Sequence, residues 1–124
     1  MKKALIAAVF LVGFINPLQG QPLQGLASWY SESDPGILKN TANMEIFDDQ
    51  QLTCAMWDIP FNTLIRVTNL SNGKSVVVRV NDRGPARRLV SQGRIIDLSK
   101  AAFAEIADLD KGLIEIELAI VADE

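Results

Sequence analysis

Two alternating segments joined by a tight turn occupy the middle of this chain: Thr63-Leu-Ile-Arg-Val-Thr-Asn-Leu70, Ser71-Asn-Gly73 and Lys74-Ser-Val-Val-Val-Arg-Val80. Both segments are rich in β-branched residues, and apolar side chains alternate with polar ones, which is typical of strands with one buried face. The Asn-Gly pair tolerates the positive φ angles of a tight hairpin turn. The sequence therefore predicts a β-hairpin over residues 63–80.

Outside this hairpin the chain predicts two more strands and one helix. Leu26–Tyr30 is a strand candidate, and apolar residues alternate with glutamates within Leu113–Val121. Ser99 can cap a helix. The apolar stripe of that helix is formed by Ala102, Phe103, Ile106 and Ala107. Residues 31–62 lack a clear period and read as loops. Together these elements predict a small, mainly β barrel.

The composition fits one small domain and excludes several classes of site. The 124 residues are 48% hydrophobic, which is too apolar for a disordered chain. The sequence contains no histidine, so a Ser-His-Asp triad, a Cys-His pair and a His-based zinc site are excluded. The single cysteine, Cys54, can form neither an intramolecular disulfide nor a metal cluster, and buried packing is its default role. We expect no metal and no cofactor.

The start of the chain has the layout of a secretory signal. Lys2-Lys3 precedes an apolar run over residues 4–15 and a turn-forming segment that ends at Gly20. We expect a signal peptide over residues 1–20, with cleavage between residues 20 and 25. An uncleaved anchor or a buried N-terminal helix is the alternative. No cysteine lies directly after the apolar run, so no lipid anchor is expected there. The mature protein is expected to be exported and soluble, in the periplasm or outside the cell.

Charge is unevenly distributed. Without Lys2 and Lys3 the chain has ten basic and fifteen acidic residues. Residues 65–96 nevertheless hold seven basic side chains against Asp82 alone. Such a basic segment either binds a polyanion or forms a solvated surface without a partner. An exported, acidic protein without interleaved aromatic residues in its basic stretch is a poor candidate for nucleic-acid binding.

Asp82 is the first candidate for chemistry. It lies in Asn81-Asp-Arg-Gly-Pro85, directly after the apolar strand, where Gly and Pro favour a tight turn. A carboxylate held rigidly in a cleft is what acid–base chemistry on a glycosidic bond requires. The alternative is a purely structural Asx turn or a surface pair between Asp82 and Arg83.

Other candidates are scattered along the chain. Glu45 lies in a polar loop and is either a second carboxylate or a solvated side chain. Trp29, Tyr30 and Trp57 are either stacking platforms for sugar rings or packing residues.

Six segments that occur in order together resemble one family. They are Gly25–Tyr30, Lys39–Ala42 with Glu45–Phe47, Ile59–Thr63, Val67–Gly73, Val76–Pro85 and Gly93–Ser99. Over residues 25–121 the chain resembles the rare lipoprotein A family, whose domain is a six-stranded double-psi β-barrel. The resemblance therefore implies a mainly β fold with one or two short helices.

The resemblance also implies an activity. Family members include endolytic peptidoglycan lytic transglycosylases, which cleave glycan strands between N-acetylmuramic acid and N-acetylglucosamine and leave 1,6-anhydro products. By this analogy Asp82 would act first as acid and then as base, and Glu45 would be a second catalytic carboxylate. The substrate-binding residues would be Trp29, Tyr30, Thr41, Trp57, Asn81 and Arg83. The implied partners are peptidoglycan glycan strands, with envelope or septal proteins as further candidates. Nothing in the sequence demands more than a monomer.

The chain departs from the family pattern at three positions. Met56 stands where family enzymes usually have a histidine, Met44 stands where a glycine precedes Glu45, and Asn62 replaces a glycine after Phe61. Two alternatives to an enzyme therefore stay open. One is a non-catalytic wall-binding or wall-loosening barrel like that of expansins, and the other is a barrel that docks on an envelope partner.

Overall fold

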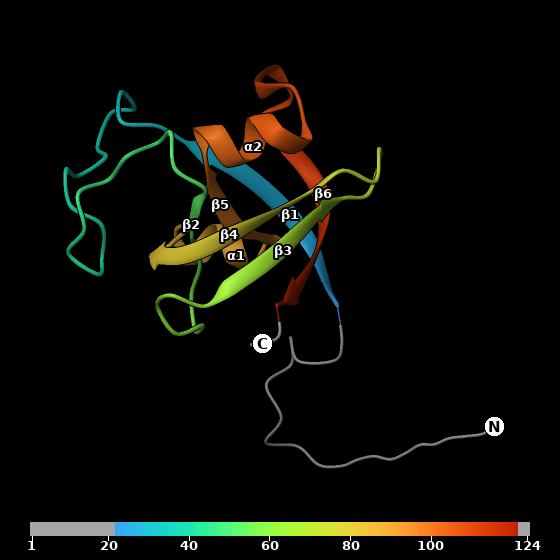
Figure 1. The fold of residues 1–124 in the computed structure, drawn as a ribbon, viewed down its shortest axis with the longest axis horizontal. Helices are drawn as coiled ribbons and strands as arrows, with labels where there is room; N and C mark the ends of the chain where they lie inside the picture. The colour runs from blue at the N-terminus through green and yellow to red at the C-terminus, as the bar shows by residue number, and fades with distance from the viewer. Residues whose placement is uncertain (1–21, 122–124) are drawn as a thin grey trace, which may run out of the picture.

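A computed structural model describes residues 22–121, which form a closed six-stranded barrel with the strand order β1-β5-β2-β4-β3-β6 (Figure 1). The expected signal peptide and its cleavage region up to residue 21 lie outside the described residues. The strands are β1 (Leu23–Tyr30), β2 (Thr53–Ala55), β3 (Leu64–Asn69), β4 (Ser75–Asp82), β5 (Arg94–Ser99) and β6 (Leu113–Ile120). The helices are α1 (Arg87–Val90), α2 (Lys100–Ile106) and the 3₁₀ turn η1 (Leu109–Lys111).

The sheet is mixed. β1 runs parallel to β5 and β2 runs parallel to β4, whereas the other four neighbouring pairs are antiparallel. The predicted hairpin is β3–β4, with Val67 opposite Val76, and the backbone N–H of Gly73 closes its turn on the carbonyl of Asn69. β6 pairs with both β1 and β3 and so closes the barrel.

Every second side chain along the strands points inward, and these side chains fill the interior of the barrel. Ile65, Val67, Val78 and Val80 are almost fully buried, as are Ile116 and Leu118 of the closing strand. The helix α2 lies across one end of the barrel, as Figure 1 shows, and buries Phe103 and Ile106 against it. As predicted, Ser99 caps this helix by accepting a hydrogen bond from the backbone N–H of Ala102 at 3.2 Å.

Four elements were absent from the sequence prediction, namely β2, β5, α1 and the 3₁₀ turn η1. β2 lies inside the segment expected to be loop, β5 shows no clear alternation, and the short α1 has no buried residue. β2 is only three residues long and buried on both sides, so no period can appear in it. Among the described helices, none has the length and apolar character needed to cross a membrane.

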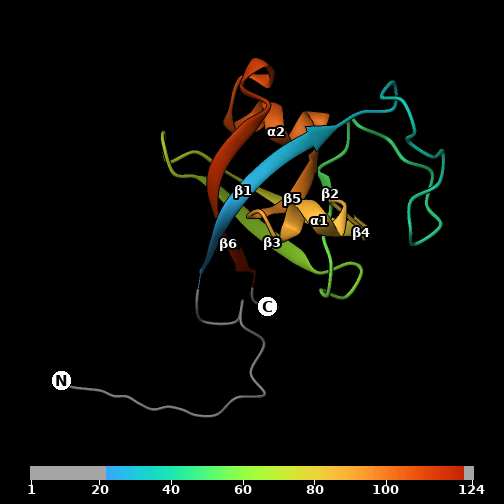
Figure 2. The ribbon, with the colours of Figure 1, turned by 180° about the vertical axis from the view of Figure 1, so that it is seen from behind.

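The site is positioned by the ends of β1 and β4. In Figure 2, which shows the barrel from behind, β1 crosses the face nearest the viewer and continues into the long loop of residues 31–52, while β4 ends beside β2 and α1. The loop returns to the barrel because Ala42 hydrogen-bonds Asp82 and Asn43 hydrogen-bonds Asn81.

Candidate functional site

Asp82 is the last residue of β4, and its partly exposed carboxylate is fixed by three donors. Oδ1 accepts hydrogen bonds from the backbone N–H groups of Ala42 and Arg83, each at 2.9 Å. Oδ2 accepts one from the hydroxyl of Tyr30 at 3.2 Å. The carboxylate therefore has a fixed orientation at the strand end.

Tyr30 joins the end of β1 to this carboxylate. Its ring is stacked on Phe47 with centroids 4.5 Å apart and planes within 5°, and the residue is buried. Burial, and then the charge of Asp82 with the hydrogen bond to it, raise the pKa of Tyr30 well above its usual value. The hydroxyl therefore keeps its proton and is a permanent donor or acceptor for Oδ2.

The two oxygens of Asp82 differ in what they can do. Oδ1 faces two N–H groups, which can only donate. Oδ2 faces a hydroxyl, which can rotate and accept as well as donate. Of the two oxygens, only Oδ2 therefore has a neighbour that can also accept a hydrogen bond.

Glu45 has a different environment. Both of its oxygens accept from the guanidinium of Arg79, at 2.8 and 3.0 Å, and the side-chain amides of Asn81 and Asn43 add bonds of 3.1 and 3.0 Å. These bonds, with Arg79 first, lower the pKa of Glu45 to about 2. At neutral pH Glu45 is therefore an ionised, paired group and holds no proton to donate.

Two of the expected substrate-binding residues are buried supports of the same loop. Thr41 and Asn81 are each 3% exposed. The Thr41 hydroxyl donates to the Asn43 side chain at 2.5 Å and accepts from the Glu45 backbone at 3.1 Å. Asn81 holds Glu45 through Nδ2, whereas its buried Oδ1 has no hydrogen-bond partner among residues 22–121.

Trp29 and Trp57 have hydrogen-bond partners other than Asp82. Trp29 packs on Phe103 and donates its indole N–H to the carbonyl of Leu109 at 3.0 Å, on the side of α2 and η1. Trp57 donates to the carbonyl of Pro85 at 2.6 Å, and the guanidinium of Arg87 lies 4.0 Å from the centre of its ring. One face of the Trp57 ring is therefore already covered.

Arg83 turns away from its neighbour Asp82. Its Nη1 donates to the backbone carbonyls of Met56 and Ile59, and the guanidinium lies 3.9 Å from the centre of the Phe61 ring. The surface ion pair between Asp82 and Arg83, which the sequence left open, is not formed within residues 22–121. Arg83 instead fixes the loop after β2.

Residues 23–118 match the lytic transglycolase family. The chain belongs to this family. Its double-psi barrel and the family resemblance seen in the sequence are thereby confirmed.

Two curated relatives of this chain carry the same name. The chain is 41% identical over 102 residues to the endolytic peptidoglycan transglycosylase RlpA of Campylobacter jejuni, covering 82% of this chain and 35% of that protein. It is 42% identical over 106 residues to the protein of the same name from Vibrio cholerae, covering 86% of this chain and 38% of that protein. The chain thus spans little more than a third of the length of these relatives.

Two solved structures of differently named proteins share this fold. The Streptomyces papain inhibitor superimposes with a TM-score of 0.65 at 26% identity, covering 84% of this chain and 97% of that one. An expansin from Clavibacter michiganensis superimposes with a TM-score of 0.64 at 22% identity, covering 84% of this chain and 52% of that one. The expansin likeness establishes the fold alone.

The structure shows the environment of the three residues that differ from the family pattern. Met56, at the usual histidine position, is 5% exposed and packs in the core, while its backbone N–H donates to the carbonyl of Asp82 at 3.1 Å. Met44 and Asn62, at the two usual glycine positions, have φ angles of 74° and 73°. The backbone there keeps the left-handed conformation that glycine adopts without strain.

Sequence reasoning missed Arg79, which holds Glu45. The signal was present in the hairpin, because residues 79 and 81 lie on the same face of a strand and both contact Glu45. What could not be read from the sequence is that the loop of residues 41–45 folds over that face.

One cluster of carboxylates has the composition of a cation site. Oxygens of Glu32, Asp48 and Asp49 lie within 4.8 Å of one another. Each of the three residues already accepts a backbone N–H, from Asp49, Gln50 and Glu32 respectively. The cluster thus serves as a turn that joins two parts of the loop.

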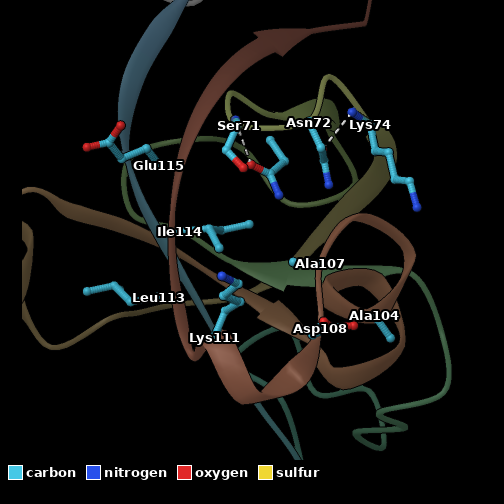
Figure 3. Close-up of a pocket in the computed structure, with 11 residues that line it drawn as sticks. Ser71, Asn72, Lys74, Ala104, Ala107, Asp108, Lys111, Leu113, Ile114 and Glu115 are labelled. Atoms are coloured by element: carbon cyan, nitrogen blue, oxygen red, sulfur yellow. Dashed lines mark hydrogen bonds between the residues drawn. The ribbon is translucent and has the colours of Figure 1, made fainter.

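A separate cavity lies at the other end of β4. It has a volume of about 490 Å³ and is shown in Figure 3 between the hairpin turn and the last turn of α2. Lys74 and Lys111 are among its lining residues, together with Asp108 and Glu115. Asp82 and Glu45 do not line it, so the cavity is not part of the site around Asp82.

Proposed function

We propose that this barrel is an endolytic peptidoglycan lytic transglycosylase and that Asp82 is its catalytic acid and base. The observation that most directly supports this proposal is the environment of Asp82. Its Oδ1 is fixed by two backbone N–H groups, and its Oδ2 faces the Tyr30 hydroxyl. Membership of the lytic transglycolase family and relatives named as peptidoglycan transglycosylases support the substrate class.

The reaction needs only one titrating group of the protein. Protonated Asp82 gives its proton from Oδ2 to the glycosidic oxygen as the bond from that oxygen to C1 of the N-acetylmuramic acid unit breaks. The resulting carboxylate takes the proton of the C6 hydroxyl of the same sugar as O6 bonds to C1. A 1,6-anhydro ring forms, no water is consumed and Asp82 is again protonated.

This scheme is compatible with the absence of a histidine. The nucleophile belongs to the substrate, so no protein group has to activate water. The ionised pair of Glu45 and Arg79 fixes the loop that carries the Ala42 donor. We propose that Glu45 supports the site in this way and adds negative charge near the reacting sugar.

The proposal also covers where the protein acts and how it contacts the glycan. The signal-like segment of residues 1–20 supports export, so the enzyme would meet glycan strands in the bacterial envelope. Trp57, with one ring face covered by Arg87, could offer only its other face to a sugar.

The test uses residues 21–124 and the variant Asp82→Asn, which keeps the shape of the side chain. Each protein is incubated with purified sacculi and with glycan strands stripped of peptides, and soluble products are identified by mass spectrometry. Products that end in 1,6-anhydro-muramic acid, released by the wild type and at least a hundredfold more slowly by the variant, are the expected result.

Other outcomes point elsewhere. Products with a free reducing end would mean hydrolysis and would contradict the lytic reaction. Binding of sacculi by both proteins without any product would favour a non-catalytic, expansin-like barrel. Absence of both binding and product would favour a barrel that docks on another protein.

A further inference from the structure

Besides Asp82 and Glu45, a third carboxylate, that of Asp97, lies on the outer face of the barrel near the turn that follows Asp82. Asp97 of β5 is opposite Ser28 of β1, and the Ser28 hydroxyl donates to its Oδ1 in a short hydrogen bond. The guanidinium of Arg94 donates to the Ser28 oxygen at 2.8 Å and to Asp97 Oδ1 at 3.4 Å. The side chain of Asp97 is held in place yet remains 16% exposed.

The strand register brings Asp97 into the same row as Asp82. Ala55 of β2 is paired with Asp97 on one side and with Asp82 on the other. The register shifts between Cys54 and Ala55, so that Asp82, rather than Asn81, is opposite Ala55. Paired residues point to the same face of a sheet, and two strand spacings separate the backbones by about 10 Å.

The free oxygen of Asp97 faces the turn that follows Asp82. No hydrogen bond within residues 22–121 uses Asp97 Oδ2. A Cβ placed on Gly84 would lie 3.6 Å from this oxygen and 3.5 Å from the Cβ of Ala55. Because Gly84 has a φ of 155°, a side chain there would also be strained.

A shared electrostatic effect supports this closeness. Charges on both Asp82 and Asp97 contribute to the raised pKa of Tyr30, behind burial as the first cause. The same two charges contribute to the raised pKa of the Cys54 thiol, again behind burial. The two aspartates therefore act on one small region of the barrel.

We propose that Asp97 is a substrate-contacting carboxylate whose Oδ2 accepts a hydrogen bond from a hydroxyl of the glycan unit bound at Asp82. This inference rests on the proposed function. The tether to Ser28 and Arg94 occupies Oδ1 and leaves Oδ2 beside Gly84, in the turn that follows Asp82. Asp97 thus orients the sugar, and Asp82 moves the proton.

The experiment compares the full chain with the variants Asp97→Asn, Ser28→Ala and Asp110→Asn. Ser28→Ala removes a tether but keeps the carboxylate, and Asp110→Asn is a matched control at an exposed position of η1. Steady-state release of anhydro products and melting temperature are measured for each. Loss of a hydrogen bond to a charged group predicts a kcat/KM about ten- to a hundredfold lower for Asp97→Asn. Ser28→Ala, in which Arg94 still holds Asp97 Oδ1, should lose less activity than Asp97→Asn, and Asp110→Asn should stay within a few-fold of the wild type.

A binding measurement separates substrate contact from a structural tether. In the Asp82→Asn background, which is expected not to turn over, the affinity for peptide-free glycan is compared with and without Asp97→Asn. Contact predicts weaker binding by the double variant at least fivefold. Equal affinity, or wild-type turnover by Asp97→Asn, would overturn the proposal.

Two further outcomes are decisive. If Asp97→Asn does not fold, Asp97→Glu replaces it; that variant keeps the charge but displaces the free oxygen, and wild-type turnover from it would overturn the proposal. If the wild type itself releases no product, the proposed function has failed and this inference falls with it. An active wild type with an equally active Asp97→Asn overturns the role of Asp97 alone.

Discussion

At the scale of single residues, the site depends on how each polar atom of Asp82 is used. Two backbone N–H groups hold Oδ1, and one hydroxyl meets Oδ2. The sequence indicated Asp82 through its turn-forming neighbours. Its donors from residues 30 and 42 come from parts of the chain that are remote in sequence, and so they could not be predicted from the local pattern.

Removing only the hydroxyl of Tyr30 tests this arrangement. Tyr30→Phe keeps the ring stacked on Phe47 but leaves Oδ2 of Asp82 without its partner. Since a hydrogen bond to a charged group contributes about 1.5–3 kcal/mol, turnover of glycan should fall about tenfold or more. The rate of anhydro-product release is the measurement. A rate equal to that of the wild type would show that Oδ2 needs no fixed partner.

Met44 is strained at a position that suits glycine. Its φ of 74° is costly for a residue with a side chain, and the side chain is 76% exposed, so little packing is lost on its removal. Met44→Gly should stabilise the protein by about 0.5–1 kcal/mol, after the entropy cost of glycine is included. Urea unfolding measures the change. Ile46→Gly, at an exposed position without a positive φ, is the control and should destabilise the protein.

The pair of Glu45 and Arg79 predicts a pH dependence of stability. The pKa of Glu45 falls from 4.5 to about 2 on folding, so its ionised form stabilises the native state above pH 4.5. That contribution is lost as the pH falls toward 2. Because the pair is half-exposed, we expect it to contribute about 1 kcal/mol or less.

The measurement compares Glu45→Gln with the wild type by urea unfolding at pH 6 and at pH 2.5. The difference in unfolding free energy should be larger at pH 6. Glu105→Gln, at an exposed position of α2, is the matched control. A difference that grows on acidification would contradict the assigned sign.

At the scale of elements, alternation predicted the strands that have one buried face and missed those that do not. β3 and β6 alternate because one of their faces meets solvent, and both were predicted. The three residues of β2 are all buried between β4 and β5, so nothing in their sequence distinguishes them from a buried loop. Their strand conformation is imposed by their neighbours.

The start of α2 offers a test at this scale. The fully buried Ser99 hydroxyl accepts from Ala102 and donates to the carbonyl of Gln51 at 2.6 Å, so it caps the helix and also fixes the chain before β2. Ser99→Ala should therefore lower the unfolding free energy by about 1–3 kcal/mol. Thermal and urea unfolding measure the loss. The exposed Ser91→Ala should change it by less than about 0.5 kcal/mol.

At the scale of the whole molecule, the barrel depends on closure by β6. This strand supplies hydrogen-bond partners to β1 and to β3, and it contributes Ile116 and Leu118 to the core. A chain that ends at Gly112 leaves two strand edges unpaired and the core open. It should fail to fold, as judged by circular dichroism and by loss of amide-exchange protection. A chain that ends at Val121 keeps every described strand and should fold; if the shorter chain folds as well, closure is not required.

The sequence by itself determined the hairpin, the closing strand, the capped helix, the family and the choice of Asp82. These depend on local periodicity, turn chemistry and residue order, which one chain segment carries within itself. Only the tertiary structure decided that Tyr30 and Ala42 hold Asp82, that Arg79 pairs with Glu45, and that Asp97 lies two strands away in the same row. The physical reason is that each of these contacts joins separate segments, and barrel closure and the register shift beside Ala55 set the distance between them.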